Sequence, residues 1–486
     1  MLKGTTKIEL TDVNTGETRV IEKHNAITGA LQELFNPTLG HLTTESSLSS
    51  RLPVHTNLLG GLLLFDSRIE GDPLPLYAPE TANLVGCARY GTQNGSSKYF
   101  GSYNATESTV DNDTKTIKLV YDFKTSEANG TINSVCLTSL TGGYGIYTSD
   151  FMLKNSVKLA DSIYASPTIK LARSARDRTT GIYNAGEYEH LFAVDIDNDV
   201  AHYFKVTTAT TVVLLKRKIG LKQYSILGNT ADIVGDPVTI SLTTALNTGM
   251  NCNSYNFDQE TNSLYIVSMP SSTQVSYINA GSTFTVTKIV LGTNTAAQTT
   301  LTNTYTDRVL PTTAYVYRDK VYTFVTSFSS TINGKTASNY RVISFALADN
   351  TMATHGIVNG PSSYGGIPKS MYAADGRIYW QGFYDSTAGI GGLRVTNTTK
   401  TPDDTNTTYC GADIVAHNLS GSTYYPHSCV PVLNHPMLFY LSNMNASGGE
   451  GFYYMAHYLG TVNNLATPIA KVNTQTMKII YTLQEV

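Results

Sequence analysis

Charged side chains are scarce in this chain of 486 residues: Asp, Glu, Lys and Arg together make up 15% of it, against roughly 25% in typical soluble domains. A formal net charge of −3 gives no basic patch of the kind that binds nucleic acid or an anionic membrane. We therefore expect no nucleic-acid partner. The polar surface must be built largely from Thr, Ser, Asn, Gly and Tyr, which suits a particle-borne or extracellular protein and uncharged ligands such as sugars.

Cysteine is also scarce, and the five copies are far apart, odd in number and without a CxxC pair. No disulfide framework or zinc knuckle is implied. A looser group of Cys and His residues matches no common metal-site spacing, so we expect neither a metal nor a cofactor. The cysteines are Cys87, Cys136, Cys252, Cys410 and Cys429, and the looser group is Cys410, His417, His427, Cys429 and His435.

Long apolar segments are absent. The opening "MLKGTTKIELTD" has no apolar core of a signal peptide, and Gly60 and Gly61 interrupt the longest apolar run, Leu58 to Phe65. We therefore expect neither secretion by a signal peptide nor insertion into a membrane.

Strand patterns dominate the chain. One helix is predicted in "NAITGALQELFNP", where Ile27, Leu31, Leu34 and Phe35 share a face. In that interpretation the preceding Asn25 caps the helix and Pro37 ends it, as their types favour. Almost every other apolar run is short and broken by Gly, Asn, Asp or Pro.

From about residue 190 these runs repeat. The segments "SYNFDQETNSLYIVSM", "AYVYRDKVYTFVTS" and "SMYAADGRIYWQGFY" each give a strand, a turn and a second strand, with degenerate copies on both sides. The second strands open at Leu264, Val321, Ile378 and Leu438, a spacing of roughly 57 to 60 residues. A third strand follows each copy.

This rhythm predicts a mainly β chain with a β-propeller of five blades, because small antiparallel sheets bury their faces by stacking radially. A sixth blade is added if the segment Gly142 to Tyr164 forms one. The rhythm resembles that of kelch-like propellers, without their Gly-Gly pair in each blade. A β-sandwich and a β-solenoid are the competing architectures.

No catalytic set is evident: there is no G-x-S-x-G, no phosphate-binding loop and no recognisable Ser/His/Asp combination. The segment "DIDND", with Asp195, Asp197 and Asp199, begins like a calcium loop, but Val200 and Val206 stand where that loop needs Gly and Glu. A polar hairpin turn explains it better. We therefore predict no catalytic residue, although paired acids for glycoside cleavage are not visible in a sequence.

Three segments outside the repeat resemble parts of tail and tail-tip proteins of tailed bacteriophages and related particles of Gram-positive hosts. They are "KGTTKIELTDVNTGETRVIEKHNAIT" (Lys3 to Thr28), "LVYDFKTSEANGTINSVCLTS" (Leu119 to Ser139) and "IAKVNTQTMKIIYTLQEV" (Ile469 to Val486). Within the second segment, strands at Leu119 to Phe123 and Ile132 to Thr138 flank an Asn129-Gly130 turn.

The resemblance implies three parts: a β-rich adaptor with one helix over residues 1–140, the propeller over 141–463, and a C-terminal strand over 464–486. The final strand alternates Met477, Ile479, Tyr481 and Leu483 with more polar residues, so it needs a partner in a sheet. We expect it to return to the adaptor; closure of the last blade is the alternative.

Two functions follow from the resemblance and the fold. In the first, the chain is a virion protein of a tail tip or baseplate, present in several copies, that binds other tail proteins through residues 1–140. Its propeller would then present loops to a host-surface glycan or a neighbouring tail protein. In the second, the propeller is an enzyme that degrades the host envelope polysaccharide.

A ligand-binding site is predicted at Trp380, the single Trp, with Tyr379 and Tyr384 beside it, because aromatic rings stack on sugars. The strand pattern favours the alternative role for Trp380, a buried residue of a blade.

Overall fold

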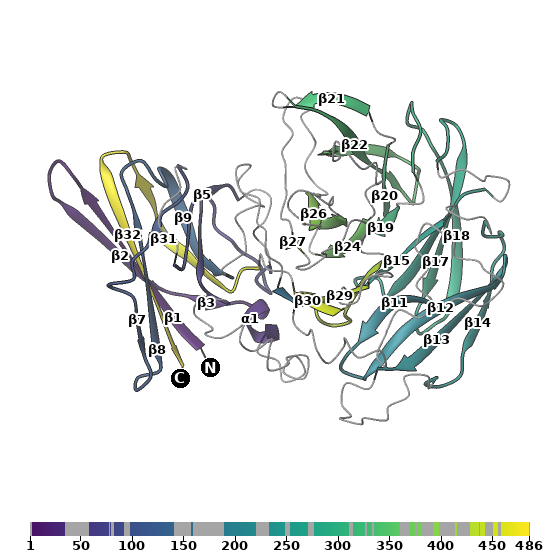
Figure 1. The fold of residues 1–486 in the computed structure, drawn as a ribbon, viewed down its shortest axis with the longest axis horizontal. Helices are drawn as coiled ribbons and strands as arrows, with labels where there is room; N and C mark the ends of the chain where they lie inside the picture. Colours follow the sequence, from purple (N-terminus) through teal and green to yellow (C-terminus); the bar gives the residue numbers. More distant parts are fainter. Residues whose placement is uncertain are drawn as a thin grey trace. The chain divides into compact units, whose positions relative to one another are not determined.

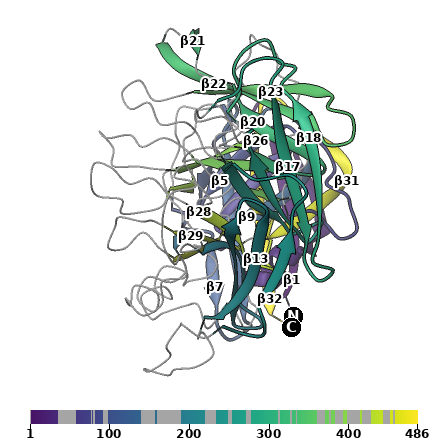
Figure 2. The ribbon, with the colours of Figure 1, turned by 90° about the vertical axis from the view of Figure 1, so that its right-hand side faces the viewer.

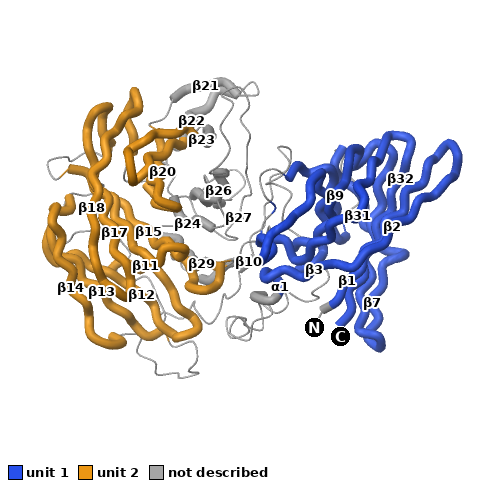
Figure 3. The backbone as a smooth tube through the Cα atoms, turned by 180° about the vertical axis from the view of Figure 1, so that it is seen from behind, with its two compact units in different colours: residues 1–40, 45–153, 455–486 blue, residues 41–44, 154–454 orange. Residues whose placement is uncertain are grey.

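The computed structural model has two compact units, residues 1–40, 45–153 and 455–486 in one and residues 41–44 and 154–454 in the other (Figure 3). The residues that it describes are 2–34, 58–76, 78, 82–91, 98–139, 157–158, 189–219, 233–247, 253–270, 277–310, 314–325, 328–332, 335–359, 370–374, 377–381, 392–397, 414–415, 428–436, 438–442, 451–454 and 458–485. Strands dominate both units.

The first unit is a β-sandwich of two antiparallel sheets (Figure 1). Its first sheet has the order β2 (Thr18–His24), β1 (Leu2–Asp12), β32 (Gln475–Glu485), β8 (Thr116–Phe123) and β6 (Ser102–Tyr103), with β7 (Thr109–Asp111) also on β8. Its second sheet has the order β3 (Ala26–Ile27), β31 (Thr461–Lys471), β9 (Gly130–Thr138), β4 (Gly61–Phe65) and β5 (Leu84–Arg89).

The last strand, β32, lies inside the first sheet, between β1 and β8. It pairs with β1 from Leu2↔Glu485 to Asp12↔Gln475, and with β8 over most of its length. The alternating residues Met477, Ile479, Tyr481 and Leu483 are all buried, as the period of a strand with one face on a core requires. The chain re-enters the sandwich at β31, which begins at Thr461, so this part starts before the predicted residue 464.

The predicted helix of this unit is present, but it is shorter than predicted and its predicted cap is wrong. The helix α1 covers only Gly29–Leu34 of the predicted segment, because Ala26 and Ile27 pair with β31 as strand β3. Asn25 does not cap it, since its Oδ1 accepts a hydrogen bond from Thr6 Oγ1 at 2.9 Å. Phe35 and Pro37 lie outside the described residues.

The segment around Asn129-Gly130 is not a hairpin within one sheet. Strand β8 belongs to the first sheet and β9 to the second, so the turn between them carries the chain from one layer to the other. Strand β9 pairs instead with β31 and β4.

Two buried tyrosines tie the layers together. The Tyr481 hydroxyl on β32 hydrogen-bonds with Thr461 Oγ1 on β31, and the Tyr121 hydroxyl on β8 donates to the Gly60 carbonyl at 3.1 Å. Burial raises the pKa of both phenols, which therefore stay neutral and available as donors.

The second unit is a β-propeller of five antiparallel sheets among the described residues. Figure 2 gives a second view of its strands, among them β13, β17 and β18. Blade 1 contains β11 (His190–Asp195), β12 (Val200–Thr208), β13 (Thr211–Lys218) and β14 (Val238–Ser241); blade 2 contains β15 (Asn253–Asp258), β16 (Ser263–Ser268), β17 (Thr283–Val290) and β18 (Thr295–Thr302). Blade 3 contains β19 (Tyr315–Tyr317), β20 (Lys320–Phe324), β21 (Phe328–Ile332), β22 (Lys335–Ala346) and β23 (Met352–Asn359).

Blades 4 and 5 complete the set. Blade 4 contains β24 (Ser370–Ala374), β25 (Arg377–Gln381), β26 (Gly392–Asn397) and β27 (Ile414–Val415). Blade 5 contains β28 (Ser428–Pro431), β29 (Leu438–Ser442) and β30 (Gly451–Tyr454), and its fourth strand is β10 (Val157–Lys158), which comes from before blade 1. The predicted sixth-blade segment, as far as it is described, thus contributes a strand to blade 5.

The ring closes through contacts between the first strands of neighbouring blades, including β28 of blade 5 with β11 of blade 1. At that seam Val432 forms a bridge with Val194, and Leu433 N donates to the Val194 carbonyl at 2.7 Å. Apolar clusters fill the spaces between blades 1 and 2 and between blades 2 and 3. The chain is therefore mainly β with a propeller, as predicted.

We expect Tyr481→Phe to lower the free energy of unfolding of the sandwich by about 1–2 kcal/mol, because it removes a buried hydrogen bond between the layers. Urea unfolding followed by far-ultraviolet circular dichroism measures this change in the free energy of unfolding. Gln484→Ala, at an exposed position of the same strand, is the control and should stay within about 0.5 kcal/mol. Equal stability of Tyr481→Phe and the unmodified chain would contradict the role of this bond.

Candidate functional site

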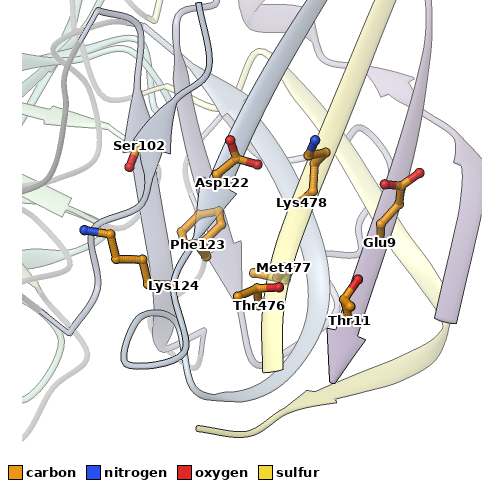
Figure 4. A pocket seen from close by; sticks show the side chains of 9 residues that line it. All are labelled: Glu9, Thr11, Ser102, Asp122, Phe123, Lys124, Thr476, Met477 and Lys478. Atoms are coloured by element: carbon orange, nitrogen blue, oxygen red, sulfur yellow. The ribbon is translucent and has the colours of Figure 1, made fainter. Parts of the chain in front are cut away.

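A groove of about 410 Å³ lies on the outer face of the first sandwich sheet (Figure 4). Strands β1, β6, β8 and β32 supply most of its lining. Glu9, Thr11, Asp122, Thr476 and Lys478 lie at alternate positions that face away from the core, whereas the side chains of Phe123 and Met477 are buried. The lining residues are Glu9, Thr11, Ser102, Asp122, Phe123, Lys124, Thr476, Met477 and Lys478.

Lys478 stands at the centre of this groove, between Glu9 on β1 and Asp122 on β8 (Figure 4). Both acids are its direct cross-strand neighbours, so the register of three strands from distant parts of the sequence builds a row of alternating charge. The Lys478 ammonium also contacts the Glu107 carboxylate. That hydrogen bond raises the pKa of Lys478 and lowers the pKa of Glu107.

Asn104 holds the carboxylates of Asp122 and Glu107 in place. Its Nδ2 donates to Asp122 Oδ2 at 2.7 Å and to Glu107 Oε1 at 3.2 Å, while its Oδ1 accepts from Glu107 N at 3.0 Å. Gly101 allows β6 to approach β8 closely, because a Cβ there would lie 2.7 Å from the Phe123 ring. The groove is thus a preformed polar surface.

The chemistry of the groove favours binding. Carboxylates and ammonium groups that hold one another in ion pairs recognise hydroxyls, amides and charged side chains. The sequence prediction missed this site. The sequence shows that polar residues alternate with apolar ones in β1 and β32. It does not show which residues of β8 lie opposite them.

The propeller carries polar side chains at the turns between the first and second strands of its blades. In blade 1, Asp195 accepts hydrogen bonds from Asn198 N at 3.0 Å and Asn198 Nδ2 at 2.8 Å, and Asp199 has a φ of 59°. The segment "DIDND" is therefore a hairpin turn, as interpreted from the sequence. In the part of the chain that is described, no cluster of three or more His, Cys, Asp or Glu is arranged to hold a metal ion.

Four of these turns form two connections between neighbouring blades. His435 Nε2 of blade 5 lies 3.2 Å from Asp197 Oδ2 of blade 1. Glu260 of blade 2 accepts hydrogen bonds from the Tyr317 hydroxyl at 2.5 Å and from Arg318 Nε at 2.9 Å, both in blade 3. These polar groups join blades and have a structural reason to be there.

The predicted aromatic site is only partly within the described residues. Tyr379 and Trp380 lie on β25, where Trp380 pairs with Ser370 of β24 and Arg394 of β26. Trp380 therefore lies on a strand that has a hydrogen-bonded neighbour on both sides. Tyr384 lies outside the described residues. No helix among the residues described is long and apolar enough to cross a bilayer.

Comparisons with known proteins give no family. No family model matches the chain, and no curated protein matches it. Among solved structures it is similar to the β-propeller domain of the trilobed protease from Pyrococcus furiosus, with 9% identity, coverage of 68% of this chain and 76% of that one, and a TM-score of 0.24. It is also similar to an arabinoxylan arabinofuranohydrolase of glycoside hydrolase family 43 from Bacillus subtilis, with 10% identity, coverage of 75% and 91%, and a TM-score of 0.25.

At these TM-scores and identities the two similarities carry no functional inference. The propeller assignment rests on the strand pairing of the chain itself.

We expect Lys478→Met to lower the free energy of unfolding by about 0.5–1 kcal/mol at neutral pH, the usual value of a partly exposed ion pair. Because the pKa of Glu107 is lower in the folded state than in the unfolded chain, this stabilisation is present above the unfolded pKa. It is lost as the pH falls through the folded pKa. A double-mutant cycle with Glu107→Gln, measured at neutral and acid pH, tests this; an interaction energy that does not decline in acid would contradict it.

Proposed function

We propose that this chain is a structural and host-binding protein of a phage tail tip, baseplate or phage tail-like particle. In this proposal the sandwich attaches the chain to neighbouring virion proteins, and the propeller presents loops to a host-surface glycan or to another tail protein. Several copies would be present in the particle. The localisation is the virion, after assembly in the host cytoplasm.

The observation that carries the proposal is the insertion of the propeller into the sandwich. The chain leaves the sandwich after β9 and returns at β31, and these two strands pair with each other. Because the sheets of the sandwich are completed by strands from both sides of the insertion, the sandwich and the propeller can serve separate tasks, attachment and recognition. The sequence resemblance of Lys3 to Thr28, Leu119 to Ser139 and Ile469 to Val486 falls entirely on the sandwich.

The charged groove gives the sandwich a surface suited to a protein partner. Glu9, Asp122 and Lys478 offer both signs of charge at fixed positions on strands, and complementary charge determines partner choice and register at interfaces. We assign this surface to a neighbouring virion protein.

We expect charge reversal of Lys478 to Glu to reduce incorporation of the protein into particles by at least about tenfold, since it places like charges side by side at a docking surface. Quantitative mass spectrometry of purified particles measures copies per particle, with circular dichroism confirming the fold. Lys320→Glu, a charge reversal at an exposed position of the propeller, is the matched control and should leave incorporation unchanged. If the Lys478→Glu variant is incorporated normally, the groove around Lys478 is not the surface that attaches the protein to the particle.

We expect the purified chain to bind host cell-wall glycan and to compete with intact particles for adsorption to host cells. Trp380→Ala should weaken glycan binding at a temperature where the variant stays folded, if Trp380 contributes a stacking ring. If Trp380→Ala unfolds the protein but the folded variant still binds glycan normally, Trp380 is instead a buried residue of its blade. Release of reducing ends from the glycan would instead favour the polysaccharide-degrading enzyme.

A further inference from the structure

Lys471 is a buried lysine at the end of β31, opposite Gly130 of β9, and only 1% of its surface is exposed. Its ammonium reaches into the turn that joins β8 to β9. There it donates to the Lys124 carbonyl at 2.9 Å, to the Thr125 carbonyl at 3.4 Å and to Asn129 Oδ1 at 2.9 Å. The lysine is thus held against one particular carboxamide.

Burial lowers the pKa of Lys471 to about 8, against the opposing effect of the Glu127 carboxylate. The neutral amine is therefore easier to form near neutral pH than in an exposed lysine. A desolvated neutral lysine amine is a nucleophile.

The Asn129 carboxamide is fixed at both ends. Its Oδ1 accepts from Lys471, and its Nδ2 donates to the Thr125 carbonyl at 2.8 Å. Since Cγ lies about 1.2 Å from Oδ1, the Lys471 nitrogen is at most about 4 Å from Cγ. The two atoms would have to approach by at most about 1 Å to reach the roughly 3–3.5 Å of a near-attack conformer.

Glu127 supplies a carboxylate in the same turn, without a hydrogen bond or ion pair to Lys471 or Asn129. It is 5% exposed, its charge acts on Lys471, and its Oε2 accepts a hydrogen bond from Lys124 N at 2.9 Å. Lys124 therefore connects the two groups, with its N–H on Glu127 and its carbonyl on Lys471. A buried carboxylate in this turn can accept a proton from the attacking amine through an intervening water molecule and return it to the leaving group by the same route.

We propose that Lys471 and Asn129 form an intramolecular isopeptide bond. The neutral Lys471 nitrogen attacks Asn129 Cγ, the Nζ–Cγ bond forms and the Cγ–Nδ2 bond breaks. The proton that leaves Nζ passes through water and the Glu127 carboxylate to Nδ2, which departs as ammonia. The step needs no oxidant, reductant or metal, and the chain loses about 17 Da.

The bond would join the end of β31 covalently to the start of β9, the two strands that flank the propeller insertion. The link would persist when the hydrogen bonds between these strands break. A covalent tie at this place suits a domain that transmits force, and it does not depend on the function proposed above.

The test is the intact mass of the full chain, measured after purification and again after incubation at a pH about one unit above the Lys471 pKa. We expect a mass lower by about 17 Da than the sequence requires. The full sequence mass under both conditions would overturn the proposal.

Peptide mapping must then locate the loss, because Asn129 precedes Gly130 and such a pair can also lose ammonia by forming a succinimide with its own backbone. The isopeptide bond gives a branched peptide in which trypsin does not cleave after Lys471. A loss confined to a linear peptide, with normal cleavage after Lys471, would overturn the proposal.

Three variants assign the roles. Lys471→Arg and Asn129→Ala should each restore the full mass, whereas Lys3→Arg, a conservative change of an exposed lysine on strand β1, should keep the loss. Glu127→Gln should slow bond formation at least tenfold. An unchanged rate in Glu127→Gln would overturn the proton transfer through this carboxylate.

Discussion

The pairing of β32 with both β1 and β8 is the constraint on which the rest of the fold depends. A strand in the middle of a sheet forms backbone hydrogen bonds with a neighbour on each side. The neighbours of β32 are β1, at the start of the chain, and β8, which ends at Phe123. The inward side chains of β32 also form part of the core between the layers. Without β32 the first sheet would consist of two separate pieces.

The same logic applies to the second sheet, where β31 lies between β3 and β9. Both C-terminal strands thus complete sheets that begin before the propeller. The sandwich is finished only by residues that follow the propeller, while the propeller closes its own ring with β10 in blade 5. Each unit therefore has its own closing strand.

Several described charged residues lie at joints between strands or blades. Glu260 with Arg318 connects blades 2 and 3, Arg217 with Glu189 lies within blade 1, and Lys478 with Glu107 lies on the sandwich. In a chain with few charges, these pairs fix geometry at specific places, while apolar burial supplies most of the stability.

The sequence predicted the propeller because each blade repeats the same strand, turn and strand, and the apolar openings of the second strands are regularly spaced. It did not predict the groove or the lysine of β31, because both depend on register between strands hundreds of residues apart. The tyrosines also had a role that composition alone did not indicate. The largest fully buried side chains of the described residues are all tyrosines: Tyr121, Tyr203, Tyr265, Tyr315, Tyr317 and Tyr440. At least these six of the 32 tyrosines in the chain therefore pack the cores.

The independence of the two units is tested most directly by differential scanning calorimetry of the full chain and of a chain that ends after Asn473, which lacks β32. Because β32 is a central strand of the sandwich, we predict that its removal eliminates the thermal transition of the sandwich and leaves that of the propeller within about 2 °C of its original temperature. Loss or a large shift of the propeller transition would show that the final strand is required for the propeller as well, and would contradict the account of two separately closed units.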